Sequence, residues 1–255
     1  MTAAIKIYPP PSETFRVEDL YTDIEFPDHN ITDPSLPYVV INMVSSLDGK
    51  AALNGVANGI GGPADRRVMR NLRSRADAVL RGAGTLRAEK ISAGVPEDLA
   101  RRRMSEGRPA QPLELILSRS DTASLSNLLN ASSGTVALVT QDRGPVKNLE
   151  DMERIVVPAR PDGLVDLVKA MIILKRDHGL SVILLEGGPS LNHALISSGL
   201  VSELFLTLSH RLLGGSQDQI LTLLNGQPLP PELSTPLRLI SAHLTDDEWF
   251  LRYKM

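Results

Sequence analysis

Residues 181–191 read SVILLEGGPSL, an apolar run followed by a glutamate, two glycines and a proline. A short, nearly continuous apolar run predicts a strand that is covered on both faces. Pro189 is suited to the first turn of a helix, because the N–H that proline lacks would be unpaired there in any case. The stretch therefore predicts a buried strand, a glycine turn and a helix, which is the repeating unit of an α/β sheet.

The same alternation extends along the chain. Further buried strands are predicted, in chain order, at residues 38–44, 78–80, 113–117, 136–139 and 154–157. Apolar side chains at helical spacing predict helices at 63–76 and from Leu164 to Gly179, and a charge-rich stretch predicts a solvated helix at 97–106. The last third predicts strands at 204–210, 237–240 and 249–253. We expect one mixed, mostly parallel sheet with flanking helices and antiparallel C-terminal strands.

The first 36 residues are weakly periodic and contain many turn formers, so we expect an N-terminal arm packed over one domain at residues 37–255. The strand at 204–210 and the C-terminal hairpin are rich in apolar residues on both faces. Such a sheet edge needs a cover, which is either the arm or a second subunit.

Composition argues against several classes of protein. The 255 residues carry 27 Lys and Arg against 30 Asp and Glu, a net charge of −3, which argues against general affinity for nucleic acid. The chain has no cysteine, which excludes disulfides, thiolate nucleophiles and Cys-ligated metals and fits a reducing cytoplasm. The sequence also shows no apolar run of ~20 residues and no signal-peptide pattern, so we expect no membrane partner.

Four clusters follow predicted strands and carry candidate ligand contacts. They are SSLDG at 45–49, GAGTLR at 82–87, EGGPSL at 186–191 and LGG at 213–215. Paired glycines let backbone N–H groups approach a phosphate, and a helix that begins there adds its positive end. Each cluster alone is also consistent with a plain turn, which is the simpler interpretation of SSLDG.

The chain has no P-loop, no G-x-S-x-G elbow and no histidines at metal-ligand spacing. We therefore expect no metal site, and we favour an extended nucleotide cofactor that brings its own chemistry. Two features stay open. Asn42 is either a satisfied core amide or a group that faces a pocket, and the run Arg101-Arg102-Arg103 is either an anion patch or, more simply, an exposed helix face.

Together these motifs resemble the pyrimidine reductases of riboflavin biosynthesis, the reductase half of the bifunctional deaminase-reductases. The matching stretches occur in order: VSSLDG at 44–49, GP at 62–63, LR at 72–73, ADAVL at 76–80, GAGTLRA at 82–88 and LEGGPSL at 185–191. The resemblance implies a dihydrofolate-reductase-like fold, NADPH as hydride donor and commonly a homodimer. It also implies reduction of the ribosyl group of a diaminopyrimidine ribosylamino phosphate to ribityl.

The clusters and the resemblance name three groups of site residues. Cofactor contacts are expected at Val44, Thr85, Glu89, Ser118, Arg119, Gly187, Gly188, Pro189, Ser190 and Leu191. The Arg119 guanidinium is the expected partner of the 2′-phosphate. Substrate contacts are expected at Asn42, Ser46, Arg73 and Glu186. Catalytic roles are expected for Asp48 and Glu186, because a partly buried carboxylate with a raised pKa can relay a proton.

The sequence departs from the family where the substrate is bound. The sequence has no cysteine from which to build the metal site of a zinc deaminase half, so we expect a reductase without it. The family's Asp-Pro-x-Leu-Thr-x-Arg stretch, which carries an arginine for the substrate phosphate, is replaced by KISAGVP at 90–96. Glu89 stands for the usual aspartate, and Asn58-Gly59-Ile60 stands where an aromatic residue is usual.

We therefore expect a stand-alone NADPH-dependent reductase of a pyrimidine or pteridine-like substrate. The candidates are 5-amino-6-(5-phosphoribosylamino)uracil, a diaminopyrimidine analogue and dihydrofolate. The alternative is a nucleotide-binding protein that has kept the fold without catalysis.

Overall fold

The strands of the structure follow the apolar runs of the sequence. In chain order they are β1 (Ala3–Tyr8), β2 (Glu13–Arg16), β3 (Tyr38–Ser46), β4 (Ala52–Leu53), β5 (Ala78–Gly82), β6 (Leu113–Leu117), β7 (Val136–Thr140), β8 (Glu153–Val156), β9 (Val182–Leu185), β10 (Val201–Ser209), β11 (Ile220–Leu221), β12 (Arg238–Leu244) and β13 (Glu248–Lys254). The computed structural model describes residues 2–53, 59–89, 92–118, 136–140, 153–215, 220–234 and 236–255.

The helices alternate with these strands. They are the short 3-10 turn η1 (Val17–Asp19) and the helices α1 (Pro63–Arg75), α2 (Ala83–Glu89), α3 (Glu97–Ser105), α5 (Leu167–His178) and α6 (Pro189–Ser197). Pro63 and Pro189 begin their helices, as predicted. The helix predicted from Leu164 begins at Leu167 instead, because the Asp166 side chain accepts a hydrogen bond from the Lys169 N–H and caps it there.

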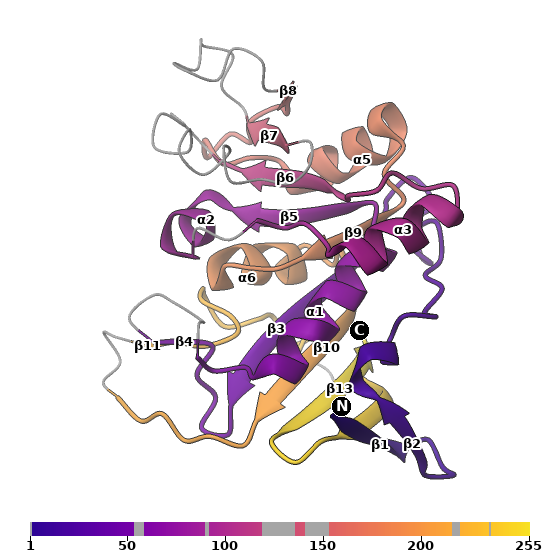
Figure 1. Cartoon of the computed structure of the whole chain (residues 1–255). Helices are drawn as coiled ribbons and strands as arrows, with labels where there is room; N and C mark the ends of the chain where they lie inside the picture. The colour runs from indigo at the N-terminus through magenta and orange to yellow at the C-terminus, as the bar shows by residue number, and fades with distance from the viewer. Residues whose placement is uncertain are drawn as a thin grey trace.

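One mixed sheet joins 11 of the described strands in the order β2-β1-β12-β13-β10-β3-β9-β5-β6-β7-β8, and β4 and β11 pair antiparallel as a separate two-stranded sheet (Figure 1). From β10 to β8 every neighbouring pair is parallel, and from β2 to β10 every pair is antiparallel. The predicted fold class is confirmed: a mixed, mostly parallel sheet with antiparallel C-terminal strands. The parallel strands β3, β9, β5 and β6 end at one edge of the sheet, where ligands of α/β proteins bind.

Both faces of the sheet are covered, and the alternation of side chains along β3 shows how. Val39 and Ile41 pack with α5 and α6 in one apolar core, whereas Tyr38 and Val40 pack with α1 in a second core on the other face. All four are buried. Burial on both faces explains why these strands appear as continuous apolar runs.

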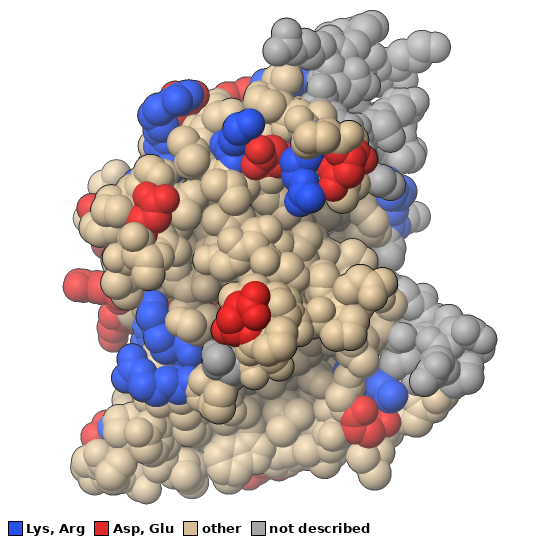
Figure 2. All heavy atoms as spheres, turned by 180° about the vertical axis from the view of Figure 1, so that it is seen from behind, with Lys and Arg blue, Asp and Glu red and all other residues tan. Residues whose placement is uncertain are grey.

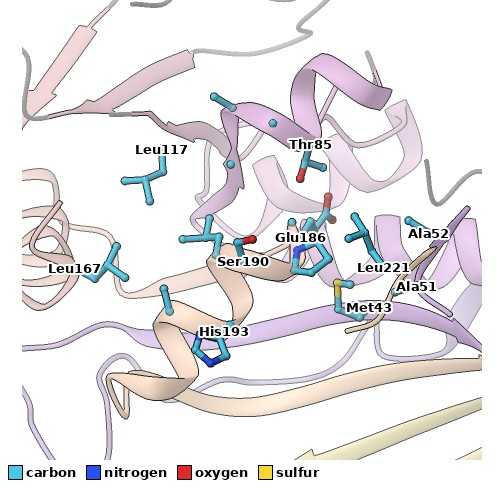
Figure 3. A pocket seen from close by; sticks show the side chains of 18 of the residues that line it. Met43, Ala51, Ala52, Thr85, Leu117, Leu167, Glu186, Ser190, His193 and Leu221 are labelled. Carbon is cyan, nitrogen blue, oxygen red and sulfur yellow. The ribbon is translucent and has the colours of Figure 1, made fainter. Parts of the chain in front are cut away.

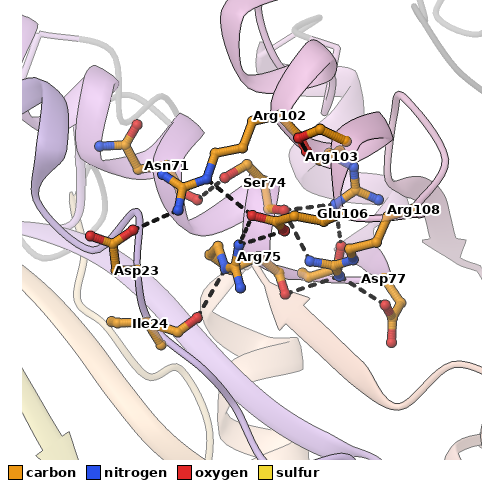
Figure 4. A network of polar contacts seen from close by, with 12 residues as sticks. Asp23, Ile24, Asn71, Ser74, Arg75, Asp77, Arg102, Arg103, Glu106 and Arg108 are labelled. Atoms are coloured by element: carbon orange, nitrogen blue, oxygen red, sulfur yellow. Dashed lines mark hydrogen bonds and ion pairs between the residues drawn. The ribbon is translucent and has the colours of Figure 1, made fainter.

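The predicted solvated helix at 97–106 is only partly solvated (Figure 4). Arg103 is buried, and its guanidinium donates hydrogen bonds to the backbone carbonyls of Ser74 and Ala76, 2.9 and 2.7 Å away. It thereby pairs carbonyls that the end of α1 leaves free. Arg103 is therefore part of neither an anion patch nor an exposed helix face, the two interpretations of the run 101–103. Arg101 and Arg102 form ion pairs at the surface.

The N-terminal residues extend the sheet. β1 pairs antiparallel with β12 and β2 pairs with β1, so the arm contributes two strands beside the C-terminal hairpin. β10, whose edge was expected to need a cover, lies between β13 and β3. The arm therefore covers the hairpin within a single chain.

The face opposite to that of Figure 1 carries Lys and Arg beside Asp and Glu in small mixed groups, with neutral side chains between them (Figure 2). In the part of the chain that the structure describes, no helix is long and apolar enough to span a bilayer.

Candidate active site

A cavity of about 1350 Å³ lies at the edge where β3, β9, β5 and β6 end. The predicted site residues in its lining are Asn42, Val44, Arg73, Thr85, Ser118, Glu186, Gly187, Gly188, Pro189, Ser190 and Leu191. The volume exceeds the ~300–1,000 Å³ of a usual small-ligand pocket, so the cavity has room for more than one small ligand. Asn42, left open by the sequence, faces this cavity.

The cavity is long, and its two ends differ (Figure 3). Leu117 and Leu167 lie at one end, whereas Met43, Ala52 and Leu221 lie at the other. Thr85, Glu186 and Ser190 lie between the two ends. The apolar ends are suited to flat rings and the polar middle to the groups that connect or orient them.

The turn between β9 and α6 brings bare backbone to the cavity. Gly187 has φ +88°, a conformation that favours glycine, and its carbonyl accepts a hydrogen bond from the Gly82 N–H at 2.9 Å. A Cβ atom added to Gly188 would lie 2.8 Å from Thr85 Oγ1. The ends of β5 and β9 therefore meet so closely that a side chain at Gly188 would displace Thr85.

The N-terminus of α6 opens on the same side. Gly188 is its N-cap and provides no side-chain cap, and the first turn has no acidic residue. Within the described residues, the Ser190 N–H has no hydrogen-bond partner. A free N–H at the positive end of a nine-residue helix suits a phosphate.

Arg73 and Glu186 form a buried ion pair beside this turn. Arg73 Nε and Nη2 each donate to a Glu186 oxygen at 2.7 Å, and both side chains are less than a tenth exposed. Arg73 Nη1 also donates to the carbonyls of Ser92 and Gly94. The two parallel hydrogen bonds fix the Glu186 carboxylate in direction.

Asp48 and Ser46 are outside the cavity lining, in contrast to the expectation for a catalytic and a substrate-binding residue. Asp48 accepts hydrogen bonds from Ser46 Oγ and from the N–H groups of Leu213 and Gly214. These bonds lower the pKa of Asp48 to about 2. The expectation of a raised pKa at Asp48 was wrong, because the carboxylate joins two turns.

The sequence interpretation missed Asp65, which lines the cavity from the first turn of α1. Asp65, Met69 and Arg73 follow one another at four-residue spacing and all reach the lining. Burial raises the pKa of Asp65 to about 7, although a hydrogen bond with Thr207 lowers it. The four-residue spacing is present in the sequence. The helix was predicted from the apolar stripe Val68, Leu72 and Ala76 on a neighbouring face, so the face that carries Asp65 was not considered.

Two expected cofactor contacts cannot be placed. Arg119 lies outside the described residues, and of Glu89 only the backbone, at the end of α2, is described.

His193 lines the cavity, and its Nε2 lies 2.6 Å from the Gln227 carbonyl oxygen. No group of three or more metal-ligating side chains occurs in the described ranges.

Comparison with known proteins places these features in one family. The model of the RibD C-terminal domain matches residues 37–249. The 2,5-diamino-6-ribosylamino-4(3H)-pyrimidinone 5′-phosphate reductase of Methanothermobacter thermautotrophicus is 29% identical over 80% of this chain and 90% of its own length. The riboflavin biosynthesis protein RibD of Escherichia coli is 24% identical over 73% of this chain, which spans 52% of that longer protein.

Solved structures show the same fold. A pyrimidine reductase-like protein from Corynebacterium diphtheriae superposes with a TM-score of 0.70 at 23% identity, and the match covers 94% of this chain and 98% of that one. RibD of Acinetobacter baumannii superposes with a TM-score of 0.68 at 22% identity, over 86% of this chain and 58% of the longer one.

Proposed function

This chain belongs to the family of the RibD C-terminal domain, and from this membership we propose that it reduces the ribosylamino group of a pyrimidine with NADPH. The observation that carries the proposal is the cavity itself, in which the bare glycine turn, the open start of α6 and the Arg73–Glu186 pair line one space. The curated relatives named as ribosylaminopyrimidinone phosphate reductases support the substrate class.

The lining fits a nicotinamide dinucleotide. The Ser190 N–H and the Gly187–Gly188 backbone would bind the phosphates, and Thr85 and Ser118 would line the rest of the cofactor path. When bound, the cofactor supplies a hydride. The preference for NADPH over NADH rests on Arg119, whose guanidinium suits a 2′-phosphate.

The described arginines in the lining are Arg73, Arg87 and Arg160. Arg73 is engaged by Glu186, and Arg160 pairs with Asp162 at 2.9 Å. Together with the loss of the family's phosphate arginine at 90–96, this leaves Arg87 as the candidate in the lining for a substrate phosphate. Glu186 is the candidate for orienting the pyrimidine, since a fixed carboxylate accepts hydrogen bonds from ring N–H and amino groups.

Cofactor binding and turnover test the proposal separately. Calorimetry with NADPH and NADH measures the first, and loss of absorbance at the dihydronicotinamide band measures the second. The substrates to compare are 2,5-diamino-6-ribosylamino-4(3H)-pyrimidinone 5′-phosphate, its dephosphorylated form, the corresponding uracil and dihydrofolate. We expect binding of NADPH and oxidation with a ribosylaminopyrimidine. Tight cofactor binding without oxidation of NADPH on the whole panel would instead support a non-catalytic nucleotide-binding protein.

A further inference from the structure

Reduction of a ribosylamino group requires a proton as well as a hydride. The bond between C1′ and the ring oxygen O4′ must break, and its electron pair goes to O4′. The oxygen then takes up a proton to become a hydroxyl group. A buried site benefits from an acid that is placed to give this proton, and a carboxyl group can do so at neutral pH only if its pKa is raised.

The carboxylates near the cavity differ in their partners. Glu186 accepts two hydrogen bonds from the Arg73 guanidinium. Glu248 is buried on β13, and its two oxygens accept the N–H groups of Gly62 and Asp65 at the start of α1. Both oxygens of each group already accept hydrogen bonds from the protein.

Asp65 is the exception. It lines the cavity, and the polar side chain that acts most strongly on its carboxyl group is the hydroxyl of Thr207, which is neutral. The Asp65 backbone N–H donates a hydrogen bond to Glu248, which fixes the first turn of α1 and with it the starting point of the Asp65 side chain. The same face of α1 carries Arg73, which positions Glu186, so the helix links the two carboxyl groups in one cavity.

We propose that Asp65 is the proton donor of this site, acting with Glu186 as the group that orients the pyrimidine. The inference rests on the proposed reductase function. In the step, the C1′–O4′ bond breaks as the amino nitrogen forms a double bond to C1′, and O4′ takes the proton from the Asp65 carboxyl group. C1′ then accepts the hydride of the dihydronicotinamide, which is oxidised, and Asp65 regains a proton from water.

The surroundings of Asp65 favour a protonated carboxyl group. Burial is the largest cause and raises the pKa of Asp65 to about 7. The negative charges of Glu248 on β13 and Glu186 after β9 raise it further, whereas the hydroxyl of Thr207 on β10 and the guanidinium of Arg66 on α1 lower it. The result is an acid that is substantially protonated at neutral pH.

The test compares Asp65→Asn with Asp177→Asn, the same change at an exposed aspartate of α5 that pairs with its neighbour Arg176. Turnover of the ribosylaminopyrimidine is measured from pH 5.5 to 9, and NADPH affinity is measured at each end of that range. Infrared difference spectra follow the carboxyl band that Asp65→Asn removes. The infrared readout needs neither substrate nor cofactor.

We expect the wild-type rate to fall above about pH 7 and the carboxyl band to disappear over the same range. Asp65→Asn should lower kcat about 100-fold or more with NADPH affinity unchanged, and Asp177→Asn should behave as the wild type. Two results would overturn the assignment of Asp65 but not the reductase function. One is an Asp65→Asn variant that is as active as an active wild type, and the other is the absence of the Asp65 carboxyl band at pH 6. A wild type that reduces no pyrimidine would reject the reductase function and the assignment with it.

Discussion

Single carboxyl groups around the cavity have separate tasks because their partners differ. Glu186 has a cationic partner, Glu248 has two backbone N–H partners, and Asp65 has a hydroxyl partner. Only the first of these was predictable from the sequence, because Glu186 directly follows a strand and precedes a glycine turn. The state of Asp65 depends on Thr207 and Glu248, which are more than a hundred residues away in the sequence.

Glu186→Gln tests the separation of substrate and cofactor contacts. The amide keeps the size of the side chain but removes its charge, so we expect NADPH affinity to change little and kcat to fall about tenfold or more. Arg73 loses its anionic partner in a buried position, so the free energy of unfolding should fall by about 2 kcal/mol. Calorimetry, steady-state kinetics and urea denaturation measure the three effects. A loss of NADPH affinity with unchanged kcat at saturation would place Glu186 on the cofactor instead.

Asp65 also predicts a dependence of stability on pH. Its pKa is about 7 in the folded chain against 3.8 for an unperturbed aspartate, so the folded state binds the proton more tightly. The stabilisation by this proton is complete below about pH 4 and is lost as the pH rises to about 7. Asp65→Asn cannot lose a proton there, so its free energy of unfolding at pH 8 should exceed that of the wild type by on the order of 3 kcal/mol. Urea denaturation at pH 5 and pH 8 gives the comparison, and equal differences at both pH values would contradict it.

At the scale of elements, the strands of the parallel half were predictable because each is an apolar run buried on both faces. The ends of helices were less so. α5 begins three residues late because of a cap at Asp166, and α3 buries Arg103 in what looked like a charged surface run. β1 and β2 were not predicted as strands, because an edge ribbon with exposed residues lacks a strong apolar pattern.

Arg103 should stabilise the junction of α1 and α3. Arg103→Met keeps much of the buried volume but removes the Arg103 hydrogen bonds to the carbonyls of Ala76 and Pro109, and it leaves the Ser74 carbonyl with Arg108 as its donor. We therefore expect the free energy of unfolding to fall by about 2–4 kcal/mol. The matched control is Arg101→Met on the same helix, where an exposed ion pair with Glu97 is lost and the change should stay within about 0.5 kcal/mol. If the denaturation curves of Arg103→Met and Arg101→Met coincide, the buried guanidinium does not stabilise the junction, and water replaces its hydrogen bonds.

The turn between β9 and α6 can be tested by adding one methyl group. The Cβ of Gly188→Ala would meet Thr85 Oγ1 at 2.8 Å, so the turn or Thr85 must move, and we expect NADPH affinity to fall about tenfold or more. Gly188→Val should abolish binding. The double variant Gly188→Ala, Thr85→Ala separates two causes. Recovered affinity assigns the loss to the clash with Thr85, and unrecovered affinity assigns it to the methyl group at the phosphate. A variant that fails to fold by circular dichroism would make the glycine structural.

At the scale of the whole molecule, the order of strands explains where the edge with the cavity lies and how the C-terminal hairpin is covered. β3 and β10 are central, with parallel strands on one side and the hairpin β12–β13 on the other. The sequence predicted the parallel strands and the hairpin, but not β1 and β2, and the order depends on pairings between segments far apart in the chain. The homodimer implied by the family stays a prediction. The hairpin edge that a second subunit could have covered is already paired with β1 of the same chain.

Removal of residues 2–16 tests which surface needs the arm. The deletion would free the outer edge of β12, where Ala242, His243 and Leu244 now pair with β1, and an unpaired strand edge recruits other chains. We expect the shortened chain to associate in a concentration-dependent way at micromolar concentration and to unfold at a lower temperature. Sedimentation velocity of the full and shortened chains gives the comparison. A full-length dimer that survives the deletion unchanged would show that subunits meet elsewhere, whereas a full-length species of only 27.7 kDa would count against the dimer and leave the arm as the sole cover.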